Sequence, residues 1–311
     1  MAIEKINGLI AAPYTPMNNN GKINPMIIPN YSEFLKKTGV KGVFICGTTG
    51  EGLSLSIKER FIIAKEWIKQ KSPEFKVIIH VGTTSLEQSK SLANHAQEIG
   101  ADAISTMAPM FLKPNNINNL VKFCREIAKE ANDTPFYYYN IPSISGVELS
   151  MVDYINLASK EIPSFYGMKF THNNFMEMQS CINLNNNKWN ILHGLDEVLL
   201  AGLSFGITGA VGSTYNFLGN LYNSIIQEFK NGKIKNARKK QLISVRIIET
   251  MIKYGGSIVA GKSMMKLIGI DCGPTRSPLP KLSENEFSKL KEELKKVDFY
   301  KYLKILNIKF F

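Results

Sequence analysis

The sequence predicts an α/β fold, a (β/α)8 TIM barrel that continues into a C-terminal helical extension. Short β-rich runs recur roughly every 20 to 35 residues, and segments with helical periodicity separate most of them. There are eight such runs, and eight parallel strands are the number that closes a barrel. After the eighth run no further strand is indicated, and the residues that follow have helical character.

The eight predicted strands are short apolar or β-branched runs. In chain order they are residues 8–15, 42–47, 77–82, 103–108, 135–141, 166–171, 190–193 and 209–213. The clearest helical segments between them are residues 56–71, 86–99 and 120–131. Pro29 falls inside the first expected helix, which we therefore expect to begin near that residue. We expect residues 1–216 to form the barrel, and residues 217–311 to supply its last helix and the extension within the same structural unit.

Composition and charge narrow the class of protein. The chain has 311 residues, of which 44% are hydrophobic and 21% charged, as in a soluble protein with a sizeable core. A net charge of +12 suits an anionic partner. The lysines after residue 280 alternate with glutamates as on a solvated helix face, so we expect no nucleic-acid binding.

Cysteines and apolar runs indicate a cytoplasmic protein. The four cysteines are far apart and form no Cys-x-x-Cys pair, so neither a disulfide framework nor a zinc site is indicated. The apolar run at residues 8–12 ends at Pro13, too short for a signal peptide. No later run reaches the length that spans a membrane, so we expect no membrane association.

The run Tyr-Gly-Met-Lys-Phe-Thr at 166–171 places a lysine inside a predicted buried strand. The two-residue period of a strand puts Gly167, Lys169 and Thr171 on one face and the apolar residues between them on the other. An ammonium group with apolar neighbours loses hydration, which favours the neutral amine. A neutral amine is the nucleophile that forms Schiff bases with carbonyl substrates. The alternative is a strand-end lysine that merely extends its amine into water.

Polar residues gather at the ends of the predicted strands that surround Lys169. The second strand runs into Gly-Thr-Thr-Gly-Glu at 47–51, the fifth ends in Tyr-Asn at 139–140, the seventh leads into Gly-Leu-Asp-Glu at 194–197, and the eighth ends in Gly-Ser-Thr at 212–214. Because the C-terminal ends of barrel strands form one face, these groups are expected to surround the same mouth. This convergence favours a catalytic Lys169.

Each of these motifs also has a purely structural interpretation. The loop at 47–52 could hold a carboxylate or phosphate with its N–H groups and hydroxyls, or it could be only a tight turn. Tyr139 could shuttle a proton or simply pack. Asp196 and Glu197 could bind sugar hydroxyls, act as acids or bases, or cap the next helix. His80 and His193 lie near strand ends, but no set of residues has the spacing of metal ligands.

Residues 256–263 match the Walker A pattern of a nucleotide-binding P-loop. A P-loop follows a strand, whereas residues 245–254 have helical character and Gly255 is typical of a helix C-terminus. The context therefore disfavours nucleotide binding, which stays a remote alternative.

Four motifs, in order along nearly the whole chain, resemble the N-acetylneuraminate lyase and dihydrodipicolinate synthase superfamily. They are Gly-Thr-Thr-Gly-Glu at 47–51, Tyr-Asn-Ile-Pro at 139–142, Gly-Met-Lys-Phe-Thr at 167–171 and Gly-Ser-Thr-Tyr-Asn at 212–216. The stretches at 80–82, 108–114 and 137–142 make the chain most similar to the lyase branch, particularly its vertebrate-like members.

The resemblance implies a class I aldolase that reversibly cleaves N-acetylneuraminate to pyruvate and N-acetylmannosamine. Lys169 would form the Schiff base with the keto carbon and Tyr139 would take part in proton transfer at the C4 hydroxyl, so that no metal or organic cofactor is needed. The resemblance also implies a homotetramer. The remaining residues implied to bind substrate are Thr48 and Thr49 for the carboxylate, and Thr171, Gly194, Asp196, Glu197 and Ser213 for the sugar.

Two positions bear on the choice within the superfamily. Synthases of the dihydrodipicolinate type usually carry an arginine where this chain has Ile144, which favours the lyase. Bacterial members often carry a tyrosine, reaching a neighbouring subunit's site, where this chain has Phe111. The proton relay would then run through Tyr139, water or the substrate carboxylate. The alternative function is a sister aldolase that acts with pyruvate on another 2-keto acid, of the dihydrodipicolinate synthase or keto-deoxy sugar acid type.

Overall fold

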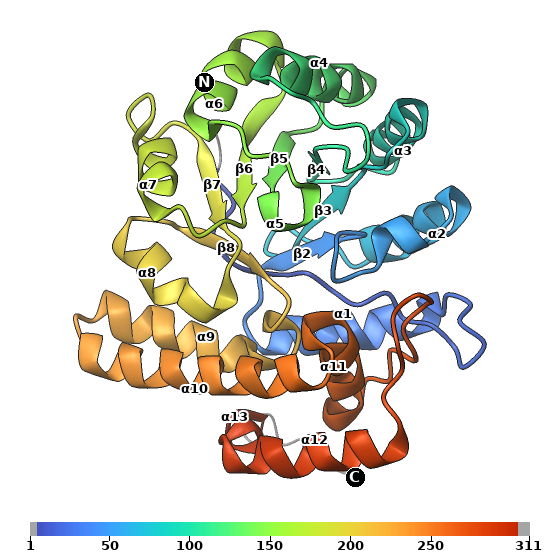
Figure 1. Cartoon of the computed structure of the whole chain (residues 1–311), viewed down its shortest axis with the longest axis vertical. Helices are drawn as coiled ribbons and strands as arrows, with labels where there is room; N and C mark the ends of the chain where they lie inside the picture. The colour runs from blue at the N-terminus through green and yellow to red at the C-terminus, as the bar shows by residue number, and fades with distance from the viewer. Residues whose placement is uncertain (1–4, 304–311) are drawn as a thin grey trace.

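The computed structural model describes residues 5–303 and contains a closed barrel of eight parallel strands (Figure 1). Each strand pairs with the next, and the eighth pairs with the first. The predicted TIM barrel is therefore confirmed. The strands are β1 (Gly8–Ala11), β2 (Gly42–Ile45), β3 (Lys76–His80), β4 (Ala103–Met107), β5 (Phe136–Asn140), β6 (Phe165–Phe170), β7 (Asn190–His193) and β8 (Gly209–Gly212).

All eight predicted strands are present, but most end earlier than predicted. The largest difference is in the first, predicted to reach residue 15 and observed to end at Ala11. Pro13 has no N–H to donate to a neighbouring strand. The N–H of Tyr14 donates to the hydroxyl of Tyr31 (3.3 Å) instead of to a strand. The chain therefore leaves the sheet and becomes loop at the mouth of the barrel.

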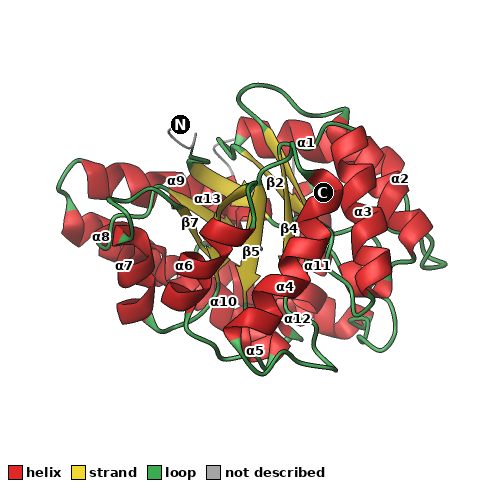
Figure 2. Cartoon of the chain, turned by 90° about the horizontal axis from the view of Figure 1, so that it is seen from above, coloured by secondary structure: helices red, strands yellow, loops and turns green. Residues whose placement is uncertain are grey.

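Helices surround the strands on the outside of the barrel, as Figure 2 shows. Several begin where the sequence supplies a cap. Ser56 and Glu59 form a reciprocal capping box at the start of α2, and Pro29 lies in the first turn of α1, as predicted. The helices that follow β1 to β7 are α1 (Ile28–Lys37), α2 (Ile57–Ile68), α3 (Leu86–Glu98), α4 (Ile117–Ala128), α5 (Pro142–Ser145), α6 (Met151–Glu161), α7 (Phe175–Asn183) and α8 (Leu199–Ser204).

Alternating strand residues build two apolar layers. The inward-facing layer, which includes Ile10, Phe44 and Tyr139, fills the inside of the barrel. The outward-facing layer packs between the strands and the helices, and it includes Met168 and Phe170 of β6. The predicted two-residue period therefore holds for residues 167–170, and it leaves Lys169 on the inward face. Tyr166 departs from it and packs against the inward layer, where the pairing with β5 shifts register.

After β8 the described chain is mostly helical, as predicted for the residues beyond 217. It forms α9 (Tyr215–Lys230), α10 (Ile234–Lys253), α11 (Gly256–Met264), α12 (Glu284–Lys296) and α13 (Phe299–Leu303). Figure 1 shows α9 and α10 side by side, and α9 also contacts β1. The predicted helical residues after 303 lie outside the described part. No helix among the described residues is both long and apolar enough to cross a bilayer.

Candidate active site

A cavity of about 300 Å³ opens at the C-terminal ends of the strands. This is the face on which TIM-barrel enzymes carry their active sites. The nine candidate residues all line this cavity: Thr48, Thr49, Tyr139, Lys169, Thr171, Gly194, Asp196, Glu197 and Ser213. A larger cavity of about 640 Å³ lies at the opposite end, beside the strand starts at Gly8 and Lys76, and none of the nine residues lines it. The smaller cavity is therefore the candidate site.

Lys169 is held between aromatic faces. Its side chain lies on the inner face of β6, and the residue is only 5% exposed. The Nζ atom lies 4.1 Å from the centre of the Tyr139 ring and 4.5 Å from that of the Phe44 ring. Within residues 5–303 no carboxylate comes within ion-pair distance of it. Aromatic rings rather than charged groups thus surround the Lys169 amine, which stays available to a ligand in the cavity.

Tyr139 lies opposite Lys169 because β5 and β6 pair in parallel with these two residues in register. Its ring packs edge-on against Phe44 and His80, at 5.5 and 6.0 Å between ring centres. Its hydroxyl makes no hydrogen bond to any described residue. The hydroxyl of Tyr137, two residues earlier on the same face, instead donates to Oδ1 of Asn190 (2.9 Å). Of these two inward-facing phenols, only that of Tyr139 is left for a ligand.

The loop at 47–52 is a tight turn whose hydroxyls reach the cavity. The N–H of Glu51 donates to the carbonyl of Thr48 (3.0 Å), and Glu51 itself has a φ of 54°. A Cβ atom at Gly52 would lie 1.8 Å from the carbonyl oxygen of Cys46, so only glycine fits there. The turn brings Thr48 and Thr49 to the cavity wall. The structural interpretation of this loop as a tight turn is therefore confirmed, and its two threonines also line the cavity.

Thr171 and Gly194 form one wall of the cavity. The hydroxyl of Thr171 is buried and has no hydrogen-bond partner in the described structure. A Cβ atom at position 194 would lie 1.9 Å from that hydroxyl oxygen. Gly194 thus leaves the space that the threonine hydroxyl occupies, and an unpaired buried hydroxyl is available to a ligand.

Asp196 is a buried carboxyl group beside the cavity. Its Oδ2 accepts hydrogen bonds from the N–H (2.8 Å) and the hydroxyl (2.6 Å) of Thr214. Burial raises its pKa from 3.8 to about 6, although the bonds from Thr214 oppose the shift. A Cβ atom at Gly212 would lie 2.0 Å from its Oδ1. Gly212 therefore makes room for this carboxyl.

The raised pKa of Asp196 predicts a specific dependence of stability on pH. Between pH 3.8 and about 6 the folded state retains a proton that the unfolded state has released, so stability falls as the pH rises through this window. The shift corresponds to about 3 kcal/mol. We expect the Asp196→Asn variant not to lose stability in this way. The measurement is urea unfolding of the wild type and of the variant, near pH 4 and near pH 7. An equal change in both proteins would contradict the prediction.

The sequence did not indicate that helices beyond the barrel complete the mouth. Ile248, Met251 and Ile252 of α10, and Ser257 of α11, also line the cavity. The position of α10 is set by contacts such as the bond from Nε2 of Gln241 to the carbonyl of Asp196 (3.1 Å). Such contacts join residues far apart in the chain, and no local spacing pattern signals them.

The structure overturns the P-loop alternative. The matching residues lie in helix α11, which α10 precedes where a P-loop has a strand. The side chain of Lys262 is 1% exposed and forms an ion pair with Glu51, so it does not face a phosphate. The metal alternative finds no support in the described residues, among which no three His, Cys, Asp or Glu side chains could jointly hold an ion.

A closed parallel barrel with a buried lysine, a free phenol and several hydroxyls at its C-terminal mouth defines a TIM-barrel enzyme. The profile of the Dihydrodipicolinate synthetase family matches residues 5–297, and the chain belongs to this family.

Relatives of known structure or function are similar over nearly the full length. N-acetylneuraminate lyase of Rattus norvegicus is 42% identical over 303 residues, which are 96% of this chain and 95% of that protein. The structure of Proteus mirabilis N-acetylneuraminate lyase has a TM-score of 0.92 at 36% identity, covering 95% of this chain and all of that one. A catalytic lysine mutant of Ruminococcus gnavus sialic acid aldolase has a TM-score of 0.90 at 28% identity and covers 96% of this chain and 98% of that one.

Proposed function

We propose that this protein is a class I aldolase that reversibly cleaves N-acetylneuraminate to pyruvate and N-acetylmannosamine. The observation that carries the proposal is the placement of the Lys169 amine at the cavity, against the rings of Tyr139 and Phe44. A buried amine without an ion-pair partner is suited to attack a ketone. Similarity to lyases and aldolases of sialic acid supports the substrate.

In the proposed reaction the Lys169 amine adds to the C2 ketone of the open-chain sugar acid, and loss of water gives a protonated imine. Tyr139 assists removal of the proton from the C4 hydroxyl. The C3–C4 bond then breaks, its electrons pass to the imine to give an enamine, and N-acetylmannosamine leaves as the aldehyde. The enamine takes a proton at C3, and water hydrolyses the imine to release pyruvate and the free lysine.

The remaining cavity residues are assigned to two parts of the substrate, its carboxylate and its sugar chain. We assign the hydroxyls of Thr48 and Thr49 to the substrate carboxylate, because they project from one tight turn. The sugar part is assigned to residues in the segments after β6, β7 and β8: Thr171, Gly194, Asp196, Glu197 and Ser213. The unpaired hydroxyl of Thr171 and the carboxyl of Asp196 suit the hydroxyl groups of a sugar.

Ile144 favours this substrate over that of a sister aldolase. It lies in α5 and lines the cavity where an acidic semialdehyde would need a cation. Ile248 and Ile252 extend the apolar wall. An apolar wall gives no partner for a second negative charge, so a neutral sugar chain fits the cavity better.

Cofactor, location and assembly follow from the same proposal. The covalent chemistry resides on Lys169, so the reaction needs neither a metal nor an organic cofactor. We further propose a cytoplasmic homotetramer in which the barrel and the C-terminal helices form one structural unit. Phe111 and Leu112 are 86% and 81% exposed, and two adjacent exposed apolar side chains suit contact with a second copy of the chain.

Reduction with borohydride in the presence of N-acetylneuraminate tests the function. We expect an adduct of the mass of reduced pyruvate, which peptide mapping should place on Lys169 alone. Trapping with pyruvate but not with N-acetylneuraminate would move the protein to a sister aldolase. No adduct with either compound would contradict the Schiff-base mechanism.

A further inference from the structure

Glu51 belongs to the tight turn that carries Thr48 and Thr49, yet it does not line the cavity. Its backbone is left-handed, with φ at 54° and ψ at 32°, a conformation that a residue other than glycine adopts at a cost. Its N–H donates to the carbonyl of Thr48 (3.0 Å). The position of Glu51 is thus tied directly to that of Thr48.

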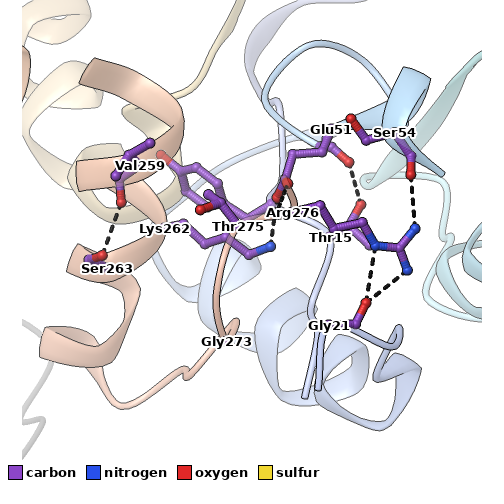
Figure 3. Close-up of polar contacts among 12 residues, drawn as sticks. Thr15, Gly21, Glu51, Ser54, Val259, Lys262, Ser263, Gly273, Thr275 and Arg276 are labelled. Atoms are coloured by element: carbon purple, nitrogen blue, oxygen red, sulfur yellow. Dashed lines mark hydrogen bonds and ion pairs between the residues drawn. The ribbon is translucent and has the colours of Figure 1, made fainter. Parts of the chain in front are cut away.

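The carboxylate of Glu51 is held by residues more than two hundred positions away. Its Oε1 accepts a hydrogen bond from Nζ of Lys262 (2.7 Å), and its Oε2 accepts one from the backbone N–H of Arg276 (2.8 Å). Both side chains of the ion pair are only 1% exposed. Figure 3 shows these contacts between the turn and the segment after α10.

The side chain of Arg276 adds further contacts between its own segment and the loops near the turn. Its guanidinium donates to the carbonyls of Gly21 (2.9 Å) and Ser54 (2.9 Å), and to both carboxylate oxygens of Glu59. Glu59 in turn caps α2 through Ser56. The segment around Arg276 is therefore joined to the loops on both sides of the turn.

A buried ion pair is a weak source of net stability, because removing two charges from water costs about as much as their attraction returns. Its geometry is nevertheless restrictive, since each charge must stay beside the other. A hydrophobic pair of similar volume would fill the space between α11 and the turn without this restriction. Net stability alone therefore does not explain why Lys262 and Glu51 are paired at this place.

We propose that the Glu51–Lys262 ion pair positions Thr48 and Thr49, so that the C-terminal helical segment sets how tightly the site holds the carboxylate of its keto acid. Lys262 and Glu51 act as positioning residues and touch no substrate. The inference rests on the proposed function, because it takes the ligand of the two threonines to be a carboxylate.

The test is Lys262→Met in the full chain, with borohydride trapping measured over a range of pyruvate concentrations. We expect the half-saturating pyruvate concentration to rise about tenfold, the scale of one lost hydrogen bond to a charged group. The adduct formed at saturation, per folded molecule, should stay that of the wild type. A purely structural role would reduce the folded fraction and leave the half-saturating concentration unchanged.

Lys253→Met is the matched control. Lys253 ends α10 and pairs with Glu293 at 2.9 Å, but its side chain is 63% exposed and neither residue touches the turn. We expect the half-saturating pyruvate concentration of the Lys253→Met variant to equal that of the wild type.

A second variant covers the case in which Lys262→Met leaves Glu51 unpaired and does not fold. The double variant Glu51→Gln/Lys262→Met buries no charge and keeps an acceptor for the N–H of Arg276. We expect it to fold and to show a raised half-saturating concentration. If the folded variants had the half-saturating pyruvate concentration of the wild type, the positioning role alone would be overturned. Absence of an adduct on the wild-type protein would instead overturn the proposed function, and the positioning role with it.

Discussion

Replacing Lys169 by alanine is expected to abolish the aldolase reaction, lowering turnover of N-acetylneuraminate by about 10⁴-fold or more. The variant loses the amine that we propose forms the imine. No other lysine of the described chain lines the cavity, so no second amine can substitute. Turnover should be measured together with borohydride trapping of pyruvate, which should give no adduct.

Lys188→Ala provides the control for this change. The Lys188 amine also lies over an aromatic ring, that of Trp189 at 4.5 Å, but the residue does not line the cavity. We expect turnover and trapping to match the wild type. An adduct that persists in Lys169→Ala, or equal losses in both variants, would show that the chemistry does not depend on Lys169.

Replacing Tyr139 by phenylalanine is expected to lower kcat by about 10²- to 10³-fold while leaving adduct formation with pyruvate intact. The aromatic ring under the Lys169 amine remains, so the lysine keeps its position. Only the phenol hydroxyl, to which we assign proton exchange with the C4 hydroxyl, is lost. The two readouts are kcat for N-acetylneuraminate and the amount of pyruvate trapped by borohydride.

Tyr137→Phe is a close control, since Tyr137 lies on the same strand and the same face. Its hydroxyl donates to Asn190 inside the barrel, and the residue does not line the cavity. We expect a loss of about 1 kcal/mol in the free energy of unfolding and little change in kcat. If the two phenylalanine variants lost equal activity, the role of Tyr139 in proton transfer would be wrong.

Local patterns predicted the barrel correctly, and they also predicted that the candidate site residues lie around one cavity. Alternation along residues 166–171 placed Lys169 on the inner face of its strand, because side chains of a strand necessarily alternate. Parallel strands in a closed barrel end on one face. Thr48, Tyr139 and Asp196 therefore reach the same cavity as Lys169 although they belong to different strands or to the loops after them.

The Walker A match at 256–263 shows where a local pattern misleads. Within it, Gly261 is explained by close packing and Lys262 by a buried ion pair, and neither faces a phosphate. A Cβ atom at Gly261 would lie 1.9 Å from the hydroxyl oxygen of Tyr14, so α11 can approach the barrel only with glycine there. Lys262 extends from the same helix into its ion pair with Glu51.

By itself, the sequence determined the number and order of the strands, the face on which Lys169 lies and the polar groups that share its mouth. These depend on periods of a few residues and on the closure of eight parallel strands. Only the tertiary structure decided that α10 and α11 complete the cavity, and that Lys262 holds Glu51 across 211 positions of the chain. Such contacts depend on how whole helices pack, and no short-range pattern records that.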